Sequence, residues 1–169
     1  RATALALASE GASVVVHYQK SEEAAEQCAD AARRLGVKAW TIRADLADAE
    51  ACEGLLDGAC EQAGPIDILV NNASIFPRNT LLDMTLRDVA ENVQVNAMAP
   101  FLLSRSLADQ RRGGAIVNIL DTRVVHHDRV AEAFPAAELT FVIARPKADG
   151  SADDHHAGDR AAGVEAQTR

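Results

Sequence analysis

The sequence predicts an α/β fold with a parallel sheet, and three observations carry this prediction. Short β-branched runs alternate along the chain with segments of helical pattern. The unbroken apolar run 68–70 stops at Asn71 and Asn72, which is typical of a strand that is buried on both faces. The 169 residues, 48% of them apolar, suffice for one domain with a hydrophobic core.

The first elements are a helix, a strand and a second helix. Residues 1–10 are rich in Ala and Leu and predict a helix that Gly11 ends. The β-branched run 13–17 predicts a strand. Ser21 is placed as the N-cap of a polar helix that runs to Leu35, with two glutamates in its first turn. Because the chain starts inside a helix, we expect it to be truncated at its N-terminus.

The next three elements repeat this alternation. Residues 38–43 predict a second strand, and residues 49–63 predict a helix. Gly64 and Pro65 punctuate the chain before the strand 66–71. In open parallel sheets, ligands bind beyond the carboxyl ends of the strands, so the polar residues that follow this strand are expected to form the wall of a ligand crevice.

The last regular elements are a long helix and a fourth strand. Residues 85–107 predict a helix that Pro100 bends or divides. Gly113 and Gly114 turn the chain into the strand 115–120, which ends at Asp121. From about residue 122 the pattern loses its period, and residues 126–169 are predicted to form a tail without regular structure.

Composition limits the partners of the chain. The net charge of −8 argues against nucleic acid or an anionic membrane as the main partner, and no stretch reaches the length of a membrane-spanning helix. Cys28, Cys52 and Cys60 are odd in number and lack metal-type spacing, which favours buried thiols in a reducing cytosol. We therefore predict a cytoplasmic protein with a small-molecule substrate.

A set of polar residues coincides with the predicted strand ends. The set comprises Asp45, the run Asn71-Asn72-Ala73-Ser74, Asn96, and the run Val117-Asn118-Ile119-Leu120-Asp121. In this order and spacing, residues 1–125 resemble the short-chain dehydrogenase/reductase family. The resemblance implies a partial Rossmann-like dinucleotide-binding domain, in which the parallel sheet is doubly wound.

Within that family the chain is most similar to pteridine reductases and to dihydromonapterin or dihydrofolate reductases. The likeness rests on His17-Tyr18, on Lys20-Ser21, on Asn72-Ala73-Ser74-Ile75-Phe76 and on Asp121, which stands where most relatives have serine. It implies an NADPH-dependent reduction of a pterin-like or dihydrofolate-like substrate.

The residues after the first predicted strand favour NADP(H) over NAD. NAD binders usually place a carboxylate at this strand end, but here the position is His17, and no acid occurs before Glu22. Lys20 and Ser21 lie at a helix N-terminus, which favours an anion such as the 2′-phosphate. By resemblance, Tyr18 belongs to the same site. The alternative is that Lys20 is a solvated loop residue and Ser21 only a cap.

The resemblance implies two further groups of cofactor contacts. Asp45, with Leu46, would bind the adenine through its amino group, unless Asp45 is only a turn or capping residue. Asn72, Ala73 and Ser74 would line the cofactor, unless they form an ordinary polar turn.

Three residues are candidates for the chemistry. Phe76 would stack on the pterin ring, the alternative being a core phenylalanine. Asn96 stands in mid-helix, an unfavourable place for asparagine, and the resemblance implies that it holds a water in a proton relay; the alternative is an exposed asparagine. Asp121 would lie near the nicotinamide and join proton delivery to the substrate, the alternative being a capping aspartate.

Two parts of the family pattern are missing. The glycine-rich turn that cradles phosphate should precede Arg1, and the strand before that turn belongs in the middle of the sheet. Its absence is expected to leave unpaired edges on both neighbouring strands. The family's tyrosine and lysine are replaced at the common spacing by Phe134 and Glu138. We therefore expect this chain by itself not to catalyse hydride transfer.

Several alternatives follow for the tail and for the function. As a hypothesis, the tail is out of frame, because codons for residues 152–163 can encode a family-like helix in a shifted frame. No metal site is predicted, because the adjacent histidines at 126–127 and 155–156 are more often incidental. The chain is an NADP-dependent reductase fragment, a non-catalytic binding protein, or a reductase of 3-oxoacyl or sugar substrates. The helix 85–107 makes a homo-oligomer plausible.

Overall fold

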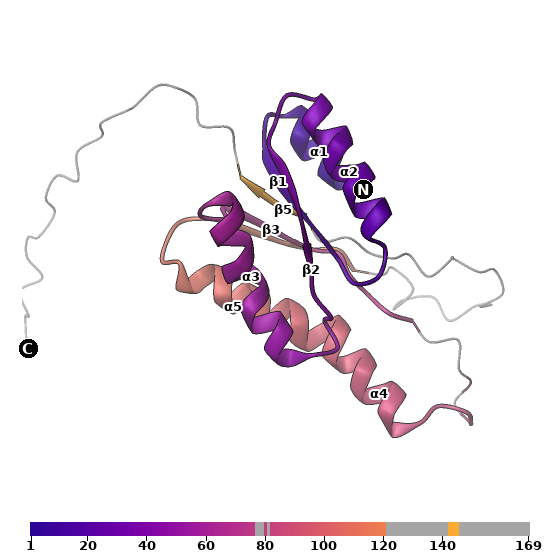
Figure 1. Ribbon diagram of the computed structural model, residues 1–169. Helices are drawn as coiled ribbons and strands as arrows, with labels where there is room; N and C mark the ends of the chain where they lie inside the picture. The colour runs from indigo at the N-terminus through magenta and orange to yellow at the C-terminus, as the bar shows by residue number, and fades with distance from the viewer. Residues whose placement is uncertain (77–79, 81, 121–141, 146–169) are drawn as a thin grey trace, which may run out of the picture.

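The computed structural model describes residues 1–76, 80, 82–120 and 142–145 of the chain (Figure 1). In this part the helices and strands alternate along the chain as far as β4. The helices are α1 (Ala2–Ser9), α2 (Glu22–Arg34), α3 (Ala49–Ala63), α4 (Leu86–Val93), the π-helical turn η1 (Gln94–Met98) and α5 (Ala99–Asp109). The strands are β1 (Ser13–Tyr18), β2 (Ala39–Arg43), β3 (Ile68–Asn71), β4 (Ala115–Asn118) and β5 (Val142–Arg145).

The five strands form one sheet in the order β2-β1-β5-β3-β4. β1 pairs with β2 in parallel, and β3 pairs with β4 in parallel. β5 lies between these two pairs and runs antiparallel to both of its neighbours. Consequently β1, β2, β3 and β4 all run in the same direction, and their carboxyl ends meet at one edge of the sheet. The α/β class predicted from the alternation is confirmed.

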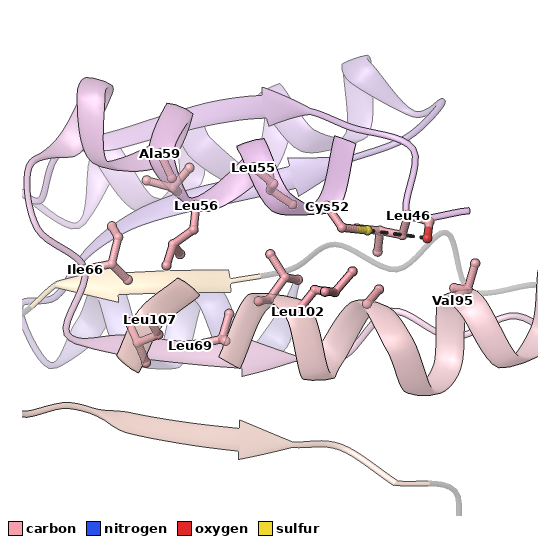
Figure 2. Close-up of a cluster of buried hydrophobic side chains, with 13 residues drawn as sticks. Leu46, Cys52, Leu55, Leu56, Ala59, Ile66, Leu69, Val95, Leu102 and Leu107 are labelled. Carbon is pink, nitrogen blue, oxygen red and sulfur yellow. Dashed lines mark hydrogen bonds between the residues drawn. The ribbon is translucent and has the colours of Figure 1, made fainter. Parts of the chain in front are cut away.

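Helices cover both faces of this sheet, which is the doubly wound arrangement (Figure 1). α1 and α2 pack on one face, where a cluster of small residues from these helices contacts Val14 and Val16 of β1 and Val70 of β3. α3 and α5 pack on the other face around Leu56, Leu69 and Leu103. Figure 2 shows this second cluster, in which side chains of α3 and α5 point toward one another.

Most predicted boundaries agree with the structure to within about two residues. The helix predicted over residues 49–63 has these limits, and the carboxylate of Asp48 caps it by accepting from the backbone of Glu50 and Ala51. α2 begins after Ser21 as predicted, but the Ser21 hydroxyl makes no capping hydrogen bond. Gly36 ends the turn after α2 with φ of 90°, a conformation that favours glycine.

The long helix predicted over 85–107 is divided into three segments. It begins after Thr85, whose side chain forms a capping box with Asp88. Pro100 lies in the first turn of α5 and so marks a boundary, as predicted. The wide turn η1 just before it was not predicted: the Ala99 backbone N–H donates to the Gln94 carbonyl five residues back. Pro100 supplies no N–H for the regular pattern, which accounts for an irregularity at this point.

The centre of the sheet differs from the prediction. The family's first strand, which should precede Arg1, is absent, and its absence was expected to leave unpaired edges on the strands 13–17 and 66–71. Instead β5 fills the gap, with Ile143 opposite both Val15 of β1 and Leu69 of β3. Backbone groups in mid-sheet require partners, and a segment of the predicted irregular tail supplies them. The expectation of irregular structure is therefore wrong for residues 142–145, and the remainder of 126–169 lies outside the described residues.

β4 is the other departure from a fully buried parallel sheet. Within the described residues it has a strand neighbour only on its β3 side, and its side chains at Ile116 and Val117 are each 44% exposed. The predicted strand 115–120 ends at Asn118, because Ile119 keeps one backbone hydrogen bond to Asn71 and then leaves the ladder. This strand is therefore an exposed edge of the sheet.

Candidate functional site

The carboxyl edge of the sheet holds two groups of the residues that the sequence singled out. β1 and β2 end at Tyr18 and Arg43, which face each other in the ladder. β3 and β4 end at Asn71 and Asn118, which are likewise opposite each other. Between the two groups lies β5. The structure thus brings the predicted residues to one edge, in two clusters on either side of β5.

The segment after β3 is fixed by Asn96. The Asn96 Oδ1 accepts from the Ile75 backbone N–H at 2.8 Å, and its Nδ2 donates to the Ile75 carbonyl at 2.8 Å. Asn92 adds a third bond, from Nδ2 to the same carbonyl at 3.2 Å. The mid-helix asparagine is therefore explained by this contact with the backbone. Its side chain is exposed, but the amide is engaged by Ile75, so the predicted role in holding a water stays a prediction.

Residues 72–76 present small and polar groups at this edge. Asn72 and Ala73 are half-buried, with Ala73 packed against the core, while Ser74 is exposed. Phe76 is 71% exposed, which rules out the alternative of a core phenylalanine. The Asn96 contact fixes this segment at the end of β3, where the side chains of Ser74 and Phe76 are exposed.

Asn71, Asn118 and Ser104 form a polar network that the sequence analysis did not foresee as a unit. The Asn71 Nδ2 donates to the Asn118 Oδ1 at 2.9 Å and lies 3.4 Å from the Ser104 hydroxyl. The Asn71 Oδ1 is buried and has no hydrogen-bond partner in the described part of the chain. A buried acceptor of this kind calls for one more donor at the strand end. The polar residue at the end of each predicted strand was the signal that could have identified this pair.

His17 is not at the surface of the site. Its side chain is 1% exposed, and its Nε2 donates to the Ala44 carbonyl at 3.0 Å. Burial lowers the His17 pKa to about 4, against the opposing effects of the Ala44 bond and Asp45. The side chain of this predicted cofactor-binding residue is turned into the core, because odd-numbered residues of β1 face α3 and α5. A contact of His17 with the cofactor stays a prediction. Its neutral ring instead joins the ends of β1 and β2.

Asp45 and Leu46 follow β2 and have different environments. Asp45 is exposed, and its Oδ1 accepts from the Ala47 backbone N–H at 2.9 Å. This oxygen therefore stabilises a turn, which was the alternative to a contact with adenine. The Leu46 side chain is buried in the core, and its carbonyl accepts from Gln94 and from the Cys52 thiol (Figure 2). Leu46 therefore has only backbone to offer a cofactor.

The candidate phosphate site at the start of α2 is open to solvent. Lys20 is exposed, Ser21 is half-buried, and both line a shallow surface hollow together with Glu22, Glu23 and Gln27. The Tyr18 pKa is raised by burial of the ring and by the nearby Glu22, while Arg43 acts in the opposite direction. Arg43 pairs with Tyr18 and donates to the Gln19 carbonyl, so it lies beside the loop that leads to this site. The sequence analysis missed it, although its position as the last residue of β2 was the available signal.

The remaining predicted features are the residues after β4, the metal ligands and the cysteines. Asp121, Phe134, Glu138 and both histidine pairs lie outside the described residues. In the residues that are described, no group of three potential metal ligands gathers at one place. The three cysteines are unpaired, as predicted, with Cys28 and Cys52 buried. No helix in the described ranges has the length and apolar character needed to cross a membrane.

Comparison with known proteins finds one family and several related sequences that match most of the chain. The profile of the short chain dehydrogenase family matches residues 1–130. The 3-oxoacyl-acyl-carrier-protein reductase FabG of Staphylococcus aureus is 34% identical over 122 residues, which are 70% of this chain and 50% of that protein. Versicolorin reductase of Emericella nidulans is 37% identical over 146 residues, which are 83% of this chain and 55% of that protein.

A solved structure agrees with these sequence relatives. A short chain dehydrogenase from Burkholderia cenocepacia, solved in complex with NADP, superimposes with a TM-score of 0.70 at 36% identity and covers 76% of this chain and 53% of that one. The chain thus spans about half the length of the relatives that it matches. With the doubly wound sheet and the polar strand ends, the profile match over residues 1–130 shows that the chain belongs to the short chain dehydrogenase family.

Proposed function

We propose that this chain is the dinucleotide-binding part of an NADP(H)-dependent oxidoreductase. The single observation that carries the proposal is the segment 72–76, which Asn96 holds at the carboxyl edge of the sheet through both backbone groups of Ile75. In doubly wound sheets a ligand binds at this edge. The exposed Ser74 offers a hydroxyl there, and Phe76 offers an aromatic face.

The cofactor suits the charges at the start of α2. Lys20 supplies a cation, the Ser21 hydroxyl makes no capping bond, and the first backbone N–H groups of α2 point toward the same place. These groups fit a phosphate on the adenosine ribose, and the Burkholderia relative was solved with NADP. When bound, NADPH supplies the hydride; the residues named here bind and orient the cofactor.

The substrate proposed for the intact protein is a flat pterin-like ring. Phe76 supports it, because an exposed aromatic ring at the ligand edge favours offset stacking with a heteroaromatic partner. A second candidate is a carbonyl substrate such as a 3-oxoacyl thioester, which the name of the Staphylococcus relative favours. The two differ in one requirement: the pterin needs the Phe76 ring.

The chain by itself is proposed to bind without catalysing. At the spacing at which the family's tyrosine and lysine are expected stand Phe134 and Glu138, which cannot supply a phenolic proton donor and a cation. The alternative to a reductase is therefore that the whole protein binds a nucleotide without catalysing a reaction.

The test is a calorimetric titration of NADPH into the full 169-residue chain, with circular dichroism of the same sample. We expect a folded spectrum, saturable binding and no oxidation of NADPH in the presence of dihydropterin or 3-oxoacyl substrates. Absence of saturable binding by a folded chain would contradict the proposal. Oxidation of NADPH would contradict the claim that the chain does not catalyse.

We propose in addition that two copies of the chain pair through α4, η1 and α5. Large apolar side chains are exposed along these segments: Leu86, Val89, Val93, Met98 and Phe101. They recur at helical spacing, as a second copy packed against them would require. A second copy of this chain is the proposed occupant, because these exposed side chains lie on consecutive helical segments, α4, η1 and α5, that form one continuous rod (Figure 1).

A further inference from the structure

Arg43 stands beside the candidate phosphate site, although it is far from that site in the sequence. It is the last residue of β2 and pairs in the ladder with Tyr18, the last residue of β1. Side chains alternate along a strand. Ala39 packs with α2, and the Thr41 hydroxyl donates to the Glu26 carboxylate of that helix at 2.5 Å, so both residues lie on the face of β2 that α2 covers. By alternation, Arg43 is the next residue of β2 on that face.

The guanidinium is anchored at one nitrogen and open at the others. Its Nε donates to the Gln19 carbonyl at 3.2 Å, which holds the side chain against the loop that leads to Lys20 and Ser21. In the part of the chain that the structure describes, no carboxylate forms an ion pair with Arg43. The two terminal nitrogens therefore remain available as a planar pair of donors, the geometry that binds a phosphate in bidentate fashion.

We infer that Arg43 determines the choice between a 2′-phosphorylated and a 2′-hydroxylated adenosine. The inference rests on the proposed function and adds a residue to its cofactor site. Lys20 provides a mobile point charge, whereas Arg43, fixed by Gln19, provides the directional contact. The Glu22 carboxylate on the same side repels a phosphate, so the cations have to overcome it.

The test compares two small probes, 2′,5′-ADP and 5′-AMP, by calorimetry on the full-length chain at fixed ionic strength. We expect the wild-type chain to bind 2′,5′-ADP more tightly. Arg43→Gln is expected to reduce the ratio of the two affinities by about tenfold, with the 5′-AMP affinity unchanged. Arg43→Lys keeps the positive charge but loses the planar pair of donors. Its ratio of the two affinities is therefore expected to lie between those of Arg43→Gln and the wild-type chain.

Arg34→Gln is the matched control, because it makes the same substitution at the opposite, carboxyl end of α2. It is expected to leave the ratio at the wild-type value, and circular dichroism checks that each variant is folded. If Arg43→Gln retains the full preference, the inference about Arg43 is overturned while the proposed function stands.

Two other outcomes test the proposed cofactor site as well as the role of Arg43. Equal binding of both probes by the wild-type chain would overturn the inference and the preference for NADP(H), but not nucleotide binding. Failure to bind either probe, or NADPH, would remove the proposed function and this inference with it. Should Arg43→Gln not fold, Arg43→Lys decides the question alone: an unchanged ratio then overturns a directional role for Arg43.

Discussion

The carboxamide of Asn96 pairs with the backbone of Ile75 as one strand residue pairs with another, through an acceptor and a donor bond of 2.8 Å each. Gln110 does the same with Ile66: its Oε1 accepts from the Ile66 N–H at 3.1 Å, and its Nε2 donates to the Ile66 carbonyl at 3.3 Å. Ile66 precedes β3 and Ile75 follows it. Two side chains from the η1–α5 rod and its end therefore fix β3 and its flanking segments at both ends.

Removing the Asn96 clamp is expected to release the segment that carries the candidate site. In Asn96→Ala the Ile75 N–H and carbonyl lose their best partners, so the free energy of unfolding should fall by about 1–3 kcal/mol. The Ile75 amide should exchange with solvent faster, as measured by hydrogen exchange.

Asn92→Ala serves as the control. It removes one bond to the Ile75 carbonyl and the bond that the Asn92 Oδ1 accepts from the Asn96 Nδ2, but it leaves the Ile75 N–H bonded to Asn96. It should leave the exchange of the Ile75 amide near the wild-type rate. An unchanged exchange rate in Asn96→Ala would show that the clamp does not hold this segment.

Gly114 is a position where an added methyl group has no room. A Cβ at this residue would lie 2.7 Å from the Asp67 carbonyl oxygen, which already accepts from the Ala115 N–H at 2.8 Å. Gly114→Ala should force β4 away from β3 and lower the free energy of unfolding by about 2 kcal/mol in urea denaturation. Gly113→Ala, whose Cβ would meet nothing within 4 Å, should be close to neutral. Equal effects of the two substitutions would contradict the packing seen here.

The buried neutral His17 should make the protein less stable in mild acid. Its pKa is lowered to about 4 in the folded chain from 6.5, so the unfolded chain binds the proton more readily. The stabilisation is complete above pH 6.5 and is lost as the pH falls toward 4. Over this range the loss amounts to about 3 kcal/mol. Urea denaturation between pH 7 and pH 4.5 measures it.

His17→Gln removes the titration and is the variant to compare, because a carboxamide can still donate to the Ala44 carbonyl. Its stability should vary less with pH over this window. An NMR titration of the wild-type chain gives a check that needs no variant: the His17 ring should remain neutral between pH 7 and pH 5.5. Protonation of His17 near pH 6.5 would contradict its burial.

β5 should be essential to the sheet, because it pairs with both halves. Ile143 lies opposite Val15 on one side and Leu69 on the other. A proline here removes a backbone donor from a central strand, so Ile143→Pro should cost about 3 kcal/mol or more in urea denaturation. Ile143→Val, which retains the donor and the strand propensity, should behave like the wild-type chain. A proline variant of unchanged stability would show that β5 does not bridge the two halves in solution.

The proposed pairing of two copies makes Phe101 sensitive to charge. Phe101 is exposed on α5, within the apolar stripe. In sedimentation measurements the wild-type chain should form a dimer, and Phe101→Glu should weaken the association by about tenfold or more, because an unpaired carboxylate is costly in an apolar interface. Leu35→Glu changes an exposed apolar residue outside the stripe and should leave the dimer intact. A wild-type chain that remains monomeric would contradict the proposed pairing.

Most helices and strands, and the edge of the sheet at which the predicted residues lie, could be predicted from local patterns in the amino-acid sequence. The strand predicted over 13–17 and the helix predicted over 49–63 follow from local signals, since a β-branched run and the Gly64-Pro65 break act within a few residues of one another. The polar residues after the strands identified the edge, because parallel strands end together.

Which segment occupies the centre of the sheet, and which side chains reach its carboxyl edge, follows from contacts in the folded protein. β5 comes from a segment without a periodic signal, and its place depends on the unmet backbone groups of two distant strands. His17 turns inward and Arg43 lies beside the start of α2 because the ladder register sets the face of each residue. Such choices depend on contacts between residues far apart in the chain, which no local pattern encodes.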